Sequence, residues 1–153
     1  MTLQDILTPD CTFCAVSGSS KKRILDKICT IAAKKIADHS AFELLESLMA
    51  REKLGSTGIG NGIAIPHGRL NGTQQVIAIV MTTEQTIEFD AIDNRPVDIF
   101  IALFVPEDRC QDHLTTLQSI AKLFSDKYFA KNIRKCRGDN ELFQTIQQAA
   151  NAK

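Results

Sequence analysis

Residues 97–105 read VDIFIALFV and form the most hydrophobic stretch of the chain, which Pro106 follows at once. A nearly continuous apolar run of this length, ended by proline, is typical of a strand that is covered on both faces. A second run, VIAIVM at 76–81, predicts another buried strand. We therefore expect 97–105 to be a central strand, and we expect shorter strands at 63–65 and 86–89.

Helical patterns lie on both sides of these strands. Apolar side chains three and four positions apart predict helices at 20–38, 41–53, 109–126, 128–135 and 139–150. Ser40 and Glu43 have the spacing of a capping box at the start of the second helix. This order predicts an α/β domain in which helix layers enclose a sheet, and it predicts that 1–153 is one domain.

The charge balance and the N-terminal sequence limit the classes of function. Lysine and arginine together number 18, as do aspartate and glutamate, so the formal net charge is zero. Without a basic excess, neither nucleic-acid binding nor a polybasic membrane contact is favoured. The longest apolar stretch, 99–105, is too short to span a bilayer, and the first ten residues carry no basic leader. We therefore expect a cytoplasmic protein.

The chain has five cysteines, and an odd number without a signal peptide indicates reduced thiols. Cys11 and Cys14 form a lone C-x-x-C motif. A metal site of this type normally takes a second pair of ligands at regular spacing, and the sequence offers none. The simpler interpretation is that both are small buried or half-buried residues, so we expect neither a metal nor a cofactor.

The stretch 55–62, GSTGIGNG, is not expected to be regular, because four of its eight residues are glycine. It departs from both common nucleotide-binding motifs. A P-loop requires a lysine after its glycines, and the dinucleotide motif requires a third glycine where Ile63 stands. The stretch therefore indicates close approach of the backbone to a ligand or partner, and not a mononucleotide site.

His67 follows this stretch and stands between Pro66 and Gly68. Proline fixes its own backbone, while Gly68 leaves room beside the ring and exposes an N–H group. A neutral imidazole has a free lone pair near pH 7, so such a histidine can attack phosphorus and form a phosphoramidate. Loop N–H groups, Thr57 and a nearby cation would then bind the phosphoryl oxygens. The simpler alternative is a loop histidine that is bonded to a neighbouring carbonyl.

Longer segments around His67 match a known family. The string GSTGIGNGIAIPHG at 55–68, preceded by REK at 51–53, resembles the EIIA proteins of the bacterial phosphotransferase system. So does FDAIDNRPVDIFIALFVP at 89–106, which is followed by a His-Leu pair at 113–114. The resemblance is to the mannitol–fructose class, and most of all to its nitrogen-regulatory branch. It covers nearly the whole chain.

This resemblance implies a three-layer α/β/α sandwich around a mixed sheet of about five strands. It also implies that His67 is phosphorylated on Nε2 by a small histidine phosphocarrier protein, itself charged ultimately from phosphoenolpyruvate. His113 matches the family's second active-site histidine, and Arg51 matches the arginine beside it. The residues expected to cradle the phosphoryl group are Thr57, Asn61 and Gly68.

The residue patterns alone leave simpler roles open for two of these side chains. His113 stands at the edge of an apolar helical stripe, where it can be merely packed. Arg51 lies in the last turn of its helix, where a cation suits the helix dipole. His39 and the basic run at 21–23 are expected to be solvated.

The expected function is that of a phosphoryl carrier whose loading state regulates partner proteins, and not that of an enzyme acting on a small molecule. A sugar-transport EIIA that passes phosphate to a separate EIIB protein is the alternative within the family. Two alternatives lie outside it: a hydrolase or metal enzyme built on His67, His113 and Asp90 or Asp93, and an interaction module whose histidine is never loaded. No pair of metal ligands at helical spacing supports the metal enzyme.

Overall fold

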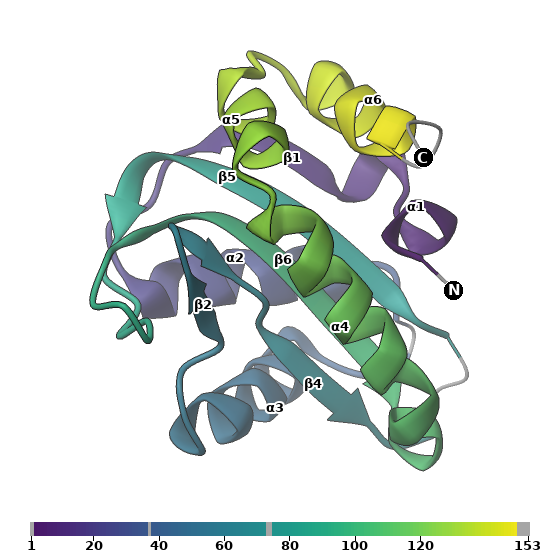
Figure 1. Ribbon diagram of the computed structural model, residues 1–153. Coiled ribbons are helices and arrows are strands. Elements are labelled where there is room, and N and C mark those ends of the chain that lie inside the picture. Colours follow the sequence, from purple (N-terminus) through teal and green to yellow (C-terminus); the bar gives the residue numbers. More distant parts are fainter. Residues whose placement is uncertain (1, 37, 73–74, 150–153) are drawn as a thin grey trace.

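The computed structural model describes residues 2–36, 38–72 and 75–149 (Figure 1). The helices are α1 (Leu3–Ile6), α2 (Lys21–Ala33), α3 (Ala41–Lys53), α4 (Cys110–Ser125), α5 (Lys127–Lys135) and α6 (Asp139–Ala149). The strands are β1 (Thr12–Val16), β2 (Gly58–Gly60), β3 (Ile63–Ala64), β4 (His67–Leu70), β5 (Ile77–Ile87) and β6 (Val97–Pro106). Short 3₁₀ helices, η1 (Pro9–Cys11) and η2 (Glu107–Arg109), precede β1 and α4.

The antiparallel pair β5 and β6 forms the centre of the sheet. On one side, β1 lies parallel to β5. On the other side, β3 and β4 lie parallel to successive parts of β6, and β2 pairs antiparallel with β3. The sheet is therefore mixed, as expected, and the short segments bring it to six strands in place of about five.

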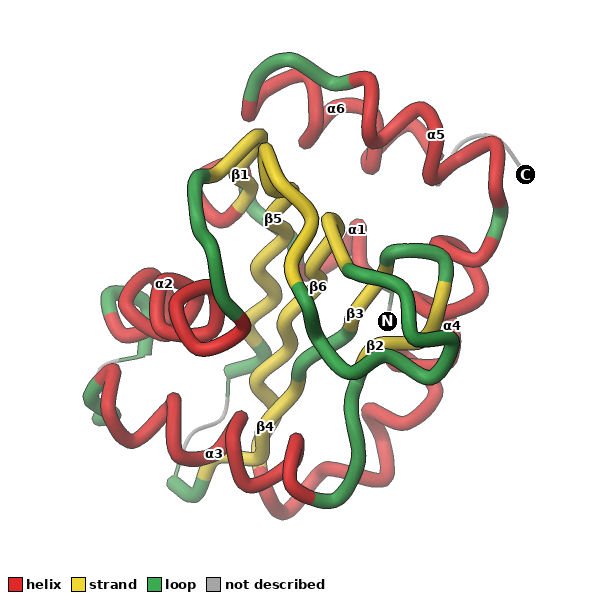
Figure 2. Tube along the Cα trace, turned by 90° about the vertical axis from the view of Figure 1, so that its left-hand side faces the viewer, coloured by secondary structure: helices red, strands yellow, loops and turns green. Residues whose placement is uncertain are grey.

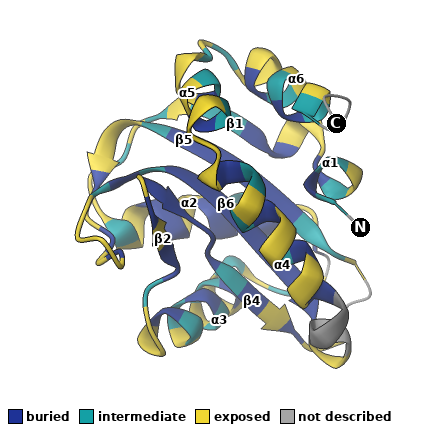
Figure 3. Cartoon of the chain, viewed as in Figure 1, coloured by how far each residue is buried: buried dark blue, intermediate teal, exposed yellow. Residues whose placement is uncertain are grey.

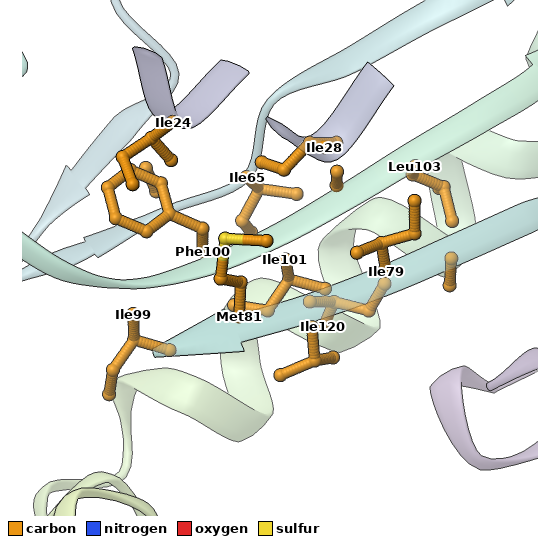
Figure 4. Close-up of a cluster of buried hydrophobic side chains, with 14 of the residues drawn as sticks. Ile24, Ile28, Ile65, Ile79, Met81, Ile99, Phe100, Ile101, Leu103 and Ile120 are labelled. Atoms are coloured by element: carbon orange, nitrogen blue, oxygen red, sulfur yellow. The ribbon is translucent and has the colours of Figure 1, made fainter. Parts of the chain in front are cut away.

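Helices cover both faces of this sheet. Figure 2 shows α2 and α3 on one side of the strands and α4, α5 and α6 on the other. The central strand β6 is buried along almost its whole length (Figure 3). Side chains from α2 and α4 reach it from opposite sides, since Phe100 lies beside Ile24 while Ile101 lies near Ile120 (Figure 4). The expected α/β/α sandwich is confirmed.

The strands differ from expectation in one main respect. β5 runs without interruption from Ile77 to Ile87, so the prediction of separate strands at 76–81 and 86–89 is wrong. Residues 84–86 are exposed, and their polar side chains give no apolar signal although the backbone stays extended. β1, β2 and β4 were not predicted, because they are short and β2 lies within the glycine-rich stretch.

The observed helices agree with the predicted ones more closely than the strands do. Ser40 and Glu43 form the expected capping box, in which each side chain accepts the other residue's N–H. The predicted bounds of α3 are correct at both ends, and those of α4 and α5 lie within one residue. α2 is shorter than predicted and ends at Ala33. The predicted last position of the final helix, residue 150, lies outside the described residues.

Candidate active site around His67

His67 is the first residue of β4 and pairs with Leu103 of β6. Only Ile65 and Pro66 separate β3 from β4, and both strands lie alongside β6. The carbonyl of Pro66 accepts the N–H of Leu103 at 2.9 Å, which fixes the backbone just before the histidine. His67 therefore stands on the edge of a rigid sheet, which positions a side chain better than a free loop does.

The imidazole of His67 is held in one tautomer. Its Nδ1 lies 2.9 Å from the carbonyl oxygen of Ile65, and because a carbonyl only accepts, Nδ1 carries the proton. The lone pair is then on Nε2, which accepts a hydrogen bond from Nε of Arg51 at 3.2 Å. Burial of the ring lowers the pKa of His67, although the Ile65 carbonyl opposes this shift, and the charge of Arg51 lowers it further. The ring is therefore neutral at pH 7.

Arg51 reaches His67 from the last turn of α3. Its Nη1 donates to the carbonyl of Gly55 at 2.8 Å, and its Nε donates to the histidine. Within the described ranges, Nη2 has no hydrogen-bond partner. The guanidinium is thus anchored on one side and keeps N–H groups for an anion beside His67, which suits its planar fork.

His113 lies on α4 and lines the same pocket as His67 and Arg51. The pocket has a volume of about 410 Å³. His113 is buried, with 7% of its surface exposed, and its Nδ1 has no hydrogen-bond partner among the described residues. An unpaired buried polar atom costs free energy, so this nitrogen is a candidate contact for a group bound in the pocket.

A smaller pocket of about 240 Å³ lies next to the first and shares His67, Arg51 and Leu117 with it. Three large apolar side chains around the two pockets are exposed, namely Leu54 (84%), Leu114 (47%) and Ile59 (38%). The histidine therefore lies in a depression with an apolar rim, a surface that is typical of protein contacts.

Gly68 lines the larger pocket, as expected, but packing alone accounts for the absence of a side chain there. A Cβ atom at this position would lie 2.4 Å from Oγ of Ser47 and 3.2 Å from its Cβ. The Ser47 hydroxyl in turn donates to the carbonyl of Arg69 at 3.2 Å. Glycine is thus required for α3 to pack directly on β4, which brings Arg51 to His67.

Thr57 does not match the cradling role predicted for it. It lines the smaller pocket, but its N–H lies 3.2 Å from both carboxylate oxygens of Glu52, and its hydroxyl also donates to that carboxylate. Both donors are therefore occupied. Glu52 is itself buried and forms an ion pair with Lys21 at 2.8 Å.

Asn61 lies away from His67, contrary to the prediction that it cradles the phosphoryl group. It turns the chain between β2 and β3 with φ of 58°, and Gly60 and Gly62 beside it also have positive φ. Its N–H donates to Asp93, and its carbonyl accepts from Arg134. It lines a separate pocket with Arg134, because this tight reversal directs it toward α5.

The carboxylates of the hydrolase or metal-enzyme alternative do not join His67 and His113. Asp90 and Asp93 line neither pocket at His67. Among the described residues, no three His, Cys, Asp or Glu side chains are grouped as a metal site requires. Cys11 is buried, whereas the Cys14 thiol donates to the carbonyl of Cys136 at 3.1 Å. No helix within the described ranges is long and apolar enough to cross a membrane.

Glu52 and Lys21 were missed by sequence reasoning. A usable signal was present, because Glu52 falls on the same stripe of α3 as Leu44 and Leu48, which are buried. A carboxylate at such a position indicates a buried partner. Lys21 gave no comparable signal, since it stands in the basic run at 21–23 that was expected to be solvated.

Comparisons with known proteins fit this geometry. Residues 5–149 match the family model described as phosphoenolpyruvate-dependent sugar phosphotransferase system, EIIA 2. A nitrogen regulatory protein of Klebsiella oxytoca is 43% identical over 150 residues, which cover 97% of this chain and 92% of that protein. The nitrogen regulatory protein of Escherichia coli K12 is 44% identical over 147 residues, with coverages of 95% and 90%.

A fructose-like EIIA component of Escherichia coli K12 is more distant, with 27% identity over 135 residues that cover 88% of this chain and 90% of that protein. The crystal structure of the nitrogen regulatory protein IIA-Ntr from Neisseria meningitidis superposes with a TM-score of 0.86. It is 32% identical, and the match covers 94% of this chain and 98% of that one. The chain therefore belongs to the EIIA 2 family of the phosphoenolpyruvate-dependent sugar phosphotransferase system.

Proposed function

We propose that this protein is a regulatory phosphoryl carrier in which Nε2 of His67 accepts a phosphoryl group from a histidine phosphocarrier protein. The observation that carries the proposal is the fixed tautomer, which leaves a lone pair on Nε2 of a neutral ring beside an arginine. Membership of the EIIA 2 family supports a role in the phosphotransferase system. The similarity to nitrogen regulatory proteins supports regulation as the purpose of loading.

The transfer needs only positioning and charge compensation. The Nε2 lone pair attacks the phosphorus, and the bond from phosphorus to the donor's histidine nitrogen breaks, with its electron pair returning to the donor ring. The ring of His67 keeps its Nδ1 proton, which the carbonyl of Ile65 continues to accept. That carbonyl therefore stabilises the positive charge that the ring acquires as the N–P bond forms.

Two neighbours have roles in this step. Arg51 must release Nε2 before the attack, and its N–H groups then bind the phosphoryl oxygens while Gly55 retains the other side of the guanidinium. His113 lines the same pocket and its Nδ1 is buried without a hydrogen-bond partner among the described residues, so we expect its ring to give the loaded group a further hydrogen bond.

The apolar rim favours a protein over a small molecule as the donor. Leu54, Ile59 and Leu114 are exposed around His67, and a partner that covers them would exclude water from the transfer.

The test is intact mass spectrometry after incubation with phosphoenolpyruvate, the first enzyme of the system and its histidine carrier. The wild type should gain one acid-labile phosphoryl group, and His67→Ala should gain none. His39→Ala is the matched control and should load like the wild type. Absence of loading in the wild type, with carriers from several bacteria, would refute the proposal and leave an interaction module.

Transfer of the phosphoryl group from His67 to an EIIB protein distinguishes a sugar-transport function from a regulatory one. The identity to nitrogen regulatory proteins, 43–44%, exceeds the 27% to the fructose-like component, which favours regulation. Loaded protein should therefore keep its phosphoryl group when mixed with isolated EIIB domains. Rapid loss to one EIIB would instead support the sugar-transport alternative.

A further inference from the structure

A buried carboxylate lies one residue after Arg51. The side chain of Glu52 is 3% exposed and shares a stripe of α3 with Leu44 and Leu48. Burying an ionised carboxylate costs free energy unless it is paired and hydrogen-bonded. A leucine at this position would pack with less cost, so the carboxylate indicates a role that apolar packing does not fill.

Donors from two other segments meet this carboxylate. Nζ of Lys21, at the start of α2, lies 2.8 Å from Oε1, and it also lies 4.3 Å from the ring centroid of Phe89. Thr57 contributes both its N–H and its hydroxyl. Glu52 thus connects the end of α3 with α2 and with the turn at 54–57.

That turn holds the oxygen atom that anchors Arg51. The carbonyl of Gly55 accepts from Nη1 at 2.8 Å, and Nε of the same guanidinium then reaches Nε2 of His67. Gly55 has φ of +148°, and a Cβ placed on it would meet nothing within 4 Å. Packing at Gly55 therefore does little to fix the turn. Its own N–H donates to the backbone carbonyl of Glu52 at 3.1 Å, and the bonds from Thr57 to the Glu52 side chain hold the turn at the next residue but one.

We propose that Glu52 is a positioning residue, which fixes the turn through Thr57 so that the Gly55 carbonyl orients Arg51 on His67. Lys21 is its counter-ion. The proposal rests on the proposed function in one respect, namely that a correctly placed Arg51 serves the loading of His67. Glu52 also lies close enough to His67 to affect its protonation. Its negative charge raises the pKa of His67, whereas burial and the charges of Arg51 and Arg69 lower it.

The first test measures the ring of His67 in the unloaded protein. Glu52→Gln keeps the shape of the side chain and removes its charge, and Glu46→Gln is the control, since Glu46 is exposed on the same helix. We expect ¹⁵N NMR to show a shifted Nε2 resonance for His67 in Glu52→Gln, because the hydrogen bond from Arg51 to Nε2 loosens. Glu46→Gln should match the wild type.

The second test measures loading kinetics with the phosphorylated histidine carrier as donor. Because misplacing a reacting group by about 1 Å can cost roughly 100-fold in rate, kcat of Glu52→Gln should fall roughly 10- to 100-fold. KM for the donor should stay unchanged, since the apolar rim is intact. Thr57→Val, which loses the hydroxyl, should follow Glu52→Gln, and Thr57→Ser, which keeps it, should load like the wild type.

A purely structural role gives a different pattern. It would lower the melting temperature of Glu52→Gln but leave the folded protein with wild-type ring resonances and wild-type kcat, and this result would overturn the proposal. Failure of the proposed function is distinguishable, because a wild type that is never loaded still reports the position of Arg51 through the His67 resonances.

Discussion

Replacing Gly68 by alanine should separate α3 from β4. The new Cβ would lie 2.4 Å from Oγ of Ser47, 3.2 Å from its Cβ and 3.5 Å from Cδ2 of Leu48. The first of these distances is shorter than any real contact, so the Ser47 hydroxyl must rotate away, and the contact with Cβ of Ser47 requires α3 and β4 to shift apart by a few tenths of an ångström. Overpacking of this kind costs about 1–3 kcal/mol. For a chain of this length each kcal/mol lowers Tm by roughly 2–4 °C, so we expect a fall of roughly 2–12 °C.

Urea unfolding of a double-mutant cycle tests this origin of the cost. Ser47→Gly removes both close atoms and the hydrogen bond to the carbonyl of Arg69, and alone it should cost about 1–2 kcal/mol. Combined with Gly68→Ala, it should relieve the clash, so the double variant should be more stable than the sum of the two costs predicts by at least about 1 kcal/mol.

Gly138→Ala is the matched control, because a Cβ there meets nothing within 4 Å, and it should change the free energy of unfolding by less than about 0.5 kcal/mol. Additive costs in the cycle, or a Gly68→Ala variant as stable as the wild type, would show that close packing of α3 on β4 is not the reason for glycine. Loading of His67 should also slow in Gly68→Ala and recover in the double variant, since the shift displaces Arg51 relative to the ring.

Three further predictions concern protonation, capping and thiol reactivity. Because the pKa of folded His67 lies below the ordinary value of 6.5, the unfolded chain binds more protons there as pH falls. Stability should therefore decrease from pH 7 to pH 5.5, and His67→Gln should show a smaller decrease in urea titrations at each pH. Asp126→Ala removes the side chain that caps α5 by accepting the N–H of Phe129 at 3.0 Å. It should cost about 1 kcal/mol of unfolding free energy without changing the loading rate, and a slower rate would contradict this separation of α5 from the site. Cys29 is buried and its thiol pKa is raised to about 12, so iodoacetamide at pH 8 should leave it unmodified in the native protein and alkylate it in urea, as peptide mass mapping would show.

The central strand and the helices were predictable because each carries its own signal. β6 is apolar over consecutive positions and is covered on both faces, which is the environment that such a run indicates. α3 has a capping box at one end and an apolar stripe, so both its start and its buried face could be inferred. The short strands β1, β2 and β4 lacked such signals, and they are held by pairing with β5, β3 and β6 respectively.

The grouping of residues in the candidate site could be predicted from the sequence, whereas the hydrogen bonds that connect them could not. His67, Arg51 and His113 come together in one pocket, as the resemblance implied. The glycine-rich stretch, however, does not by itself determine which way each of its residues faces. Thr57 faces a buried carboxylate, and Asn61 is turned toward α5 by the positive φ angles around it. These orientations depend on partners distant in the sequence, which local patterns do not contain.

The charges around His67 indicate how other proteins would distinguish the phosphorylated form from the unphosphorylated form. In the unloaded form the ring is neutral, Glu52 is paired with Lys21, and Arg51 and Arg69 leave the pocket positive. A phosphoryl group adds roughly −1.5 to −2 charges, which largely or fully cancels the positive charge of the two arginines. Loading of His67 alters none of the side chains of the apolar rim, so we expect donor and regulated partner to compete for it. Discrimination between the forms must then come from charge, and it should weaken as salt concentration rises.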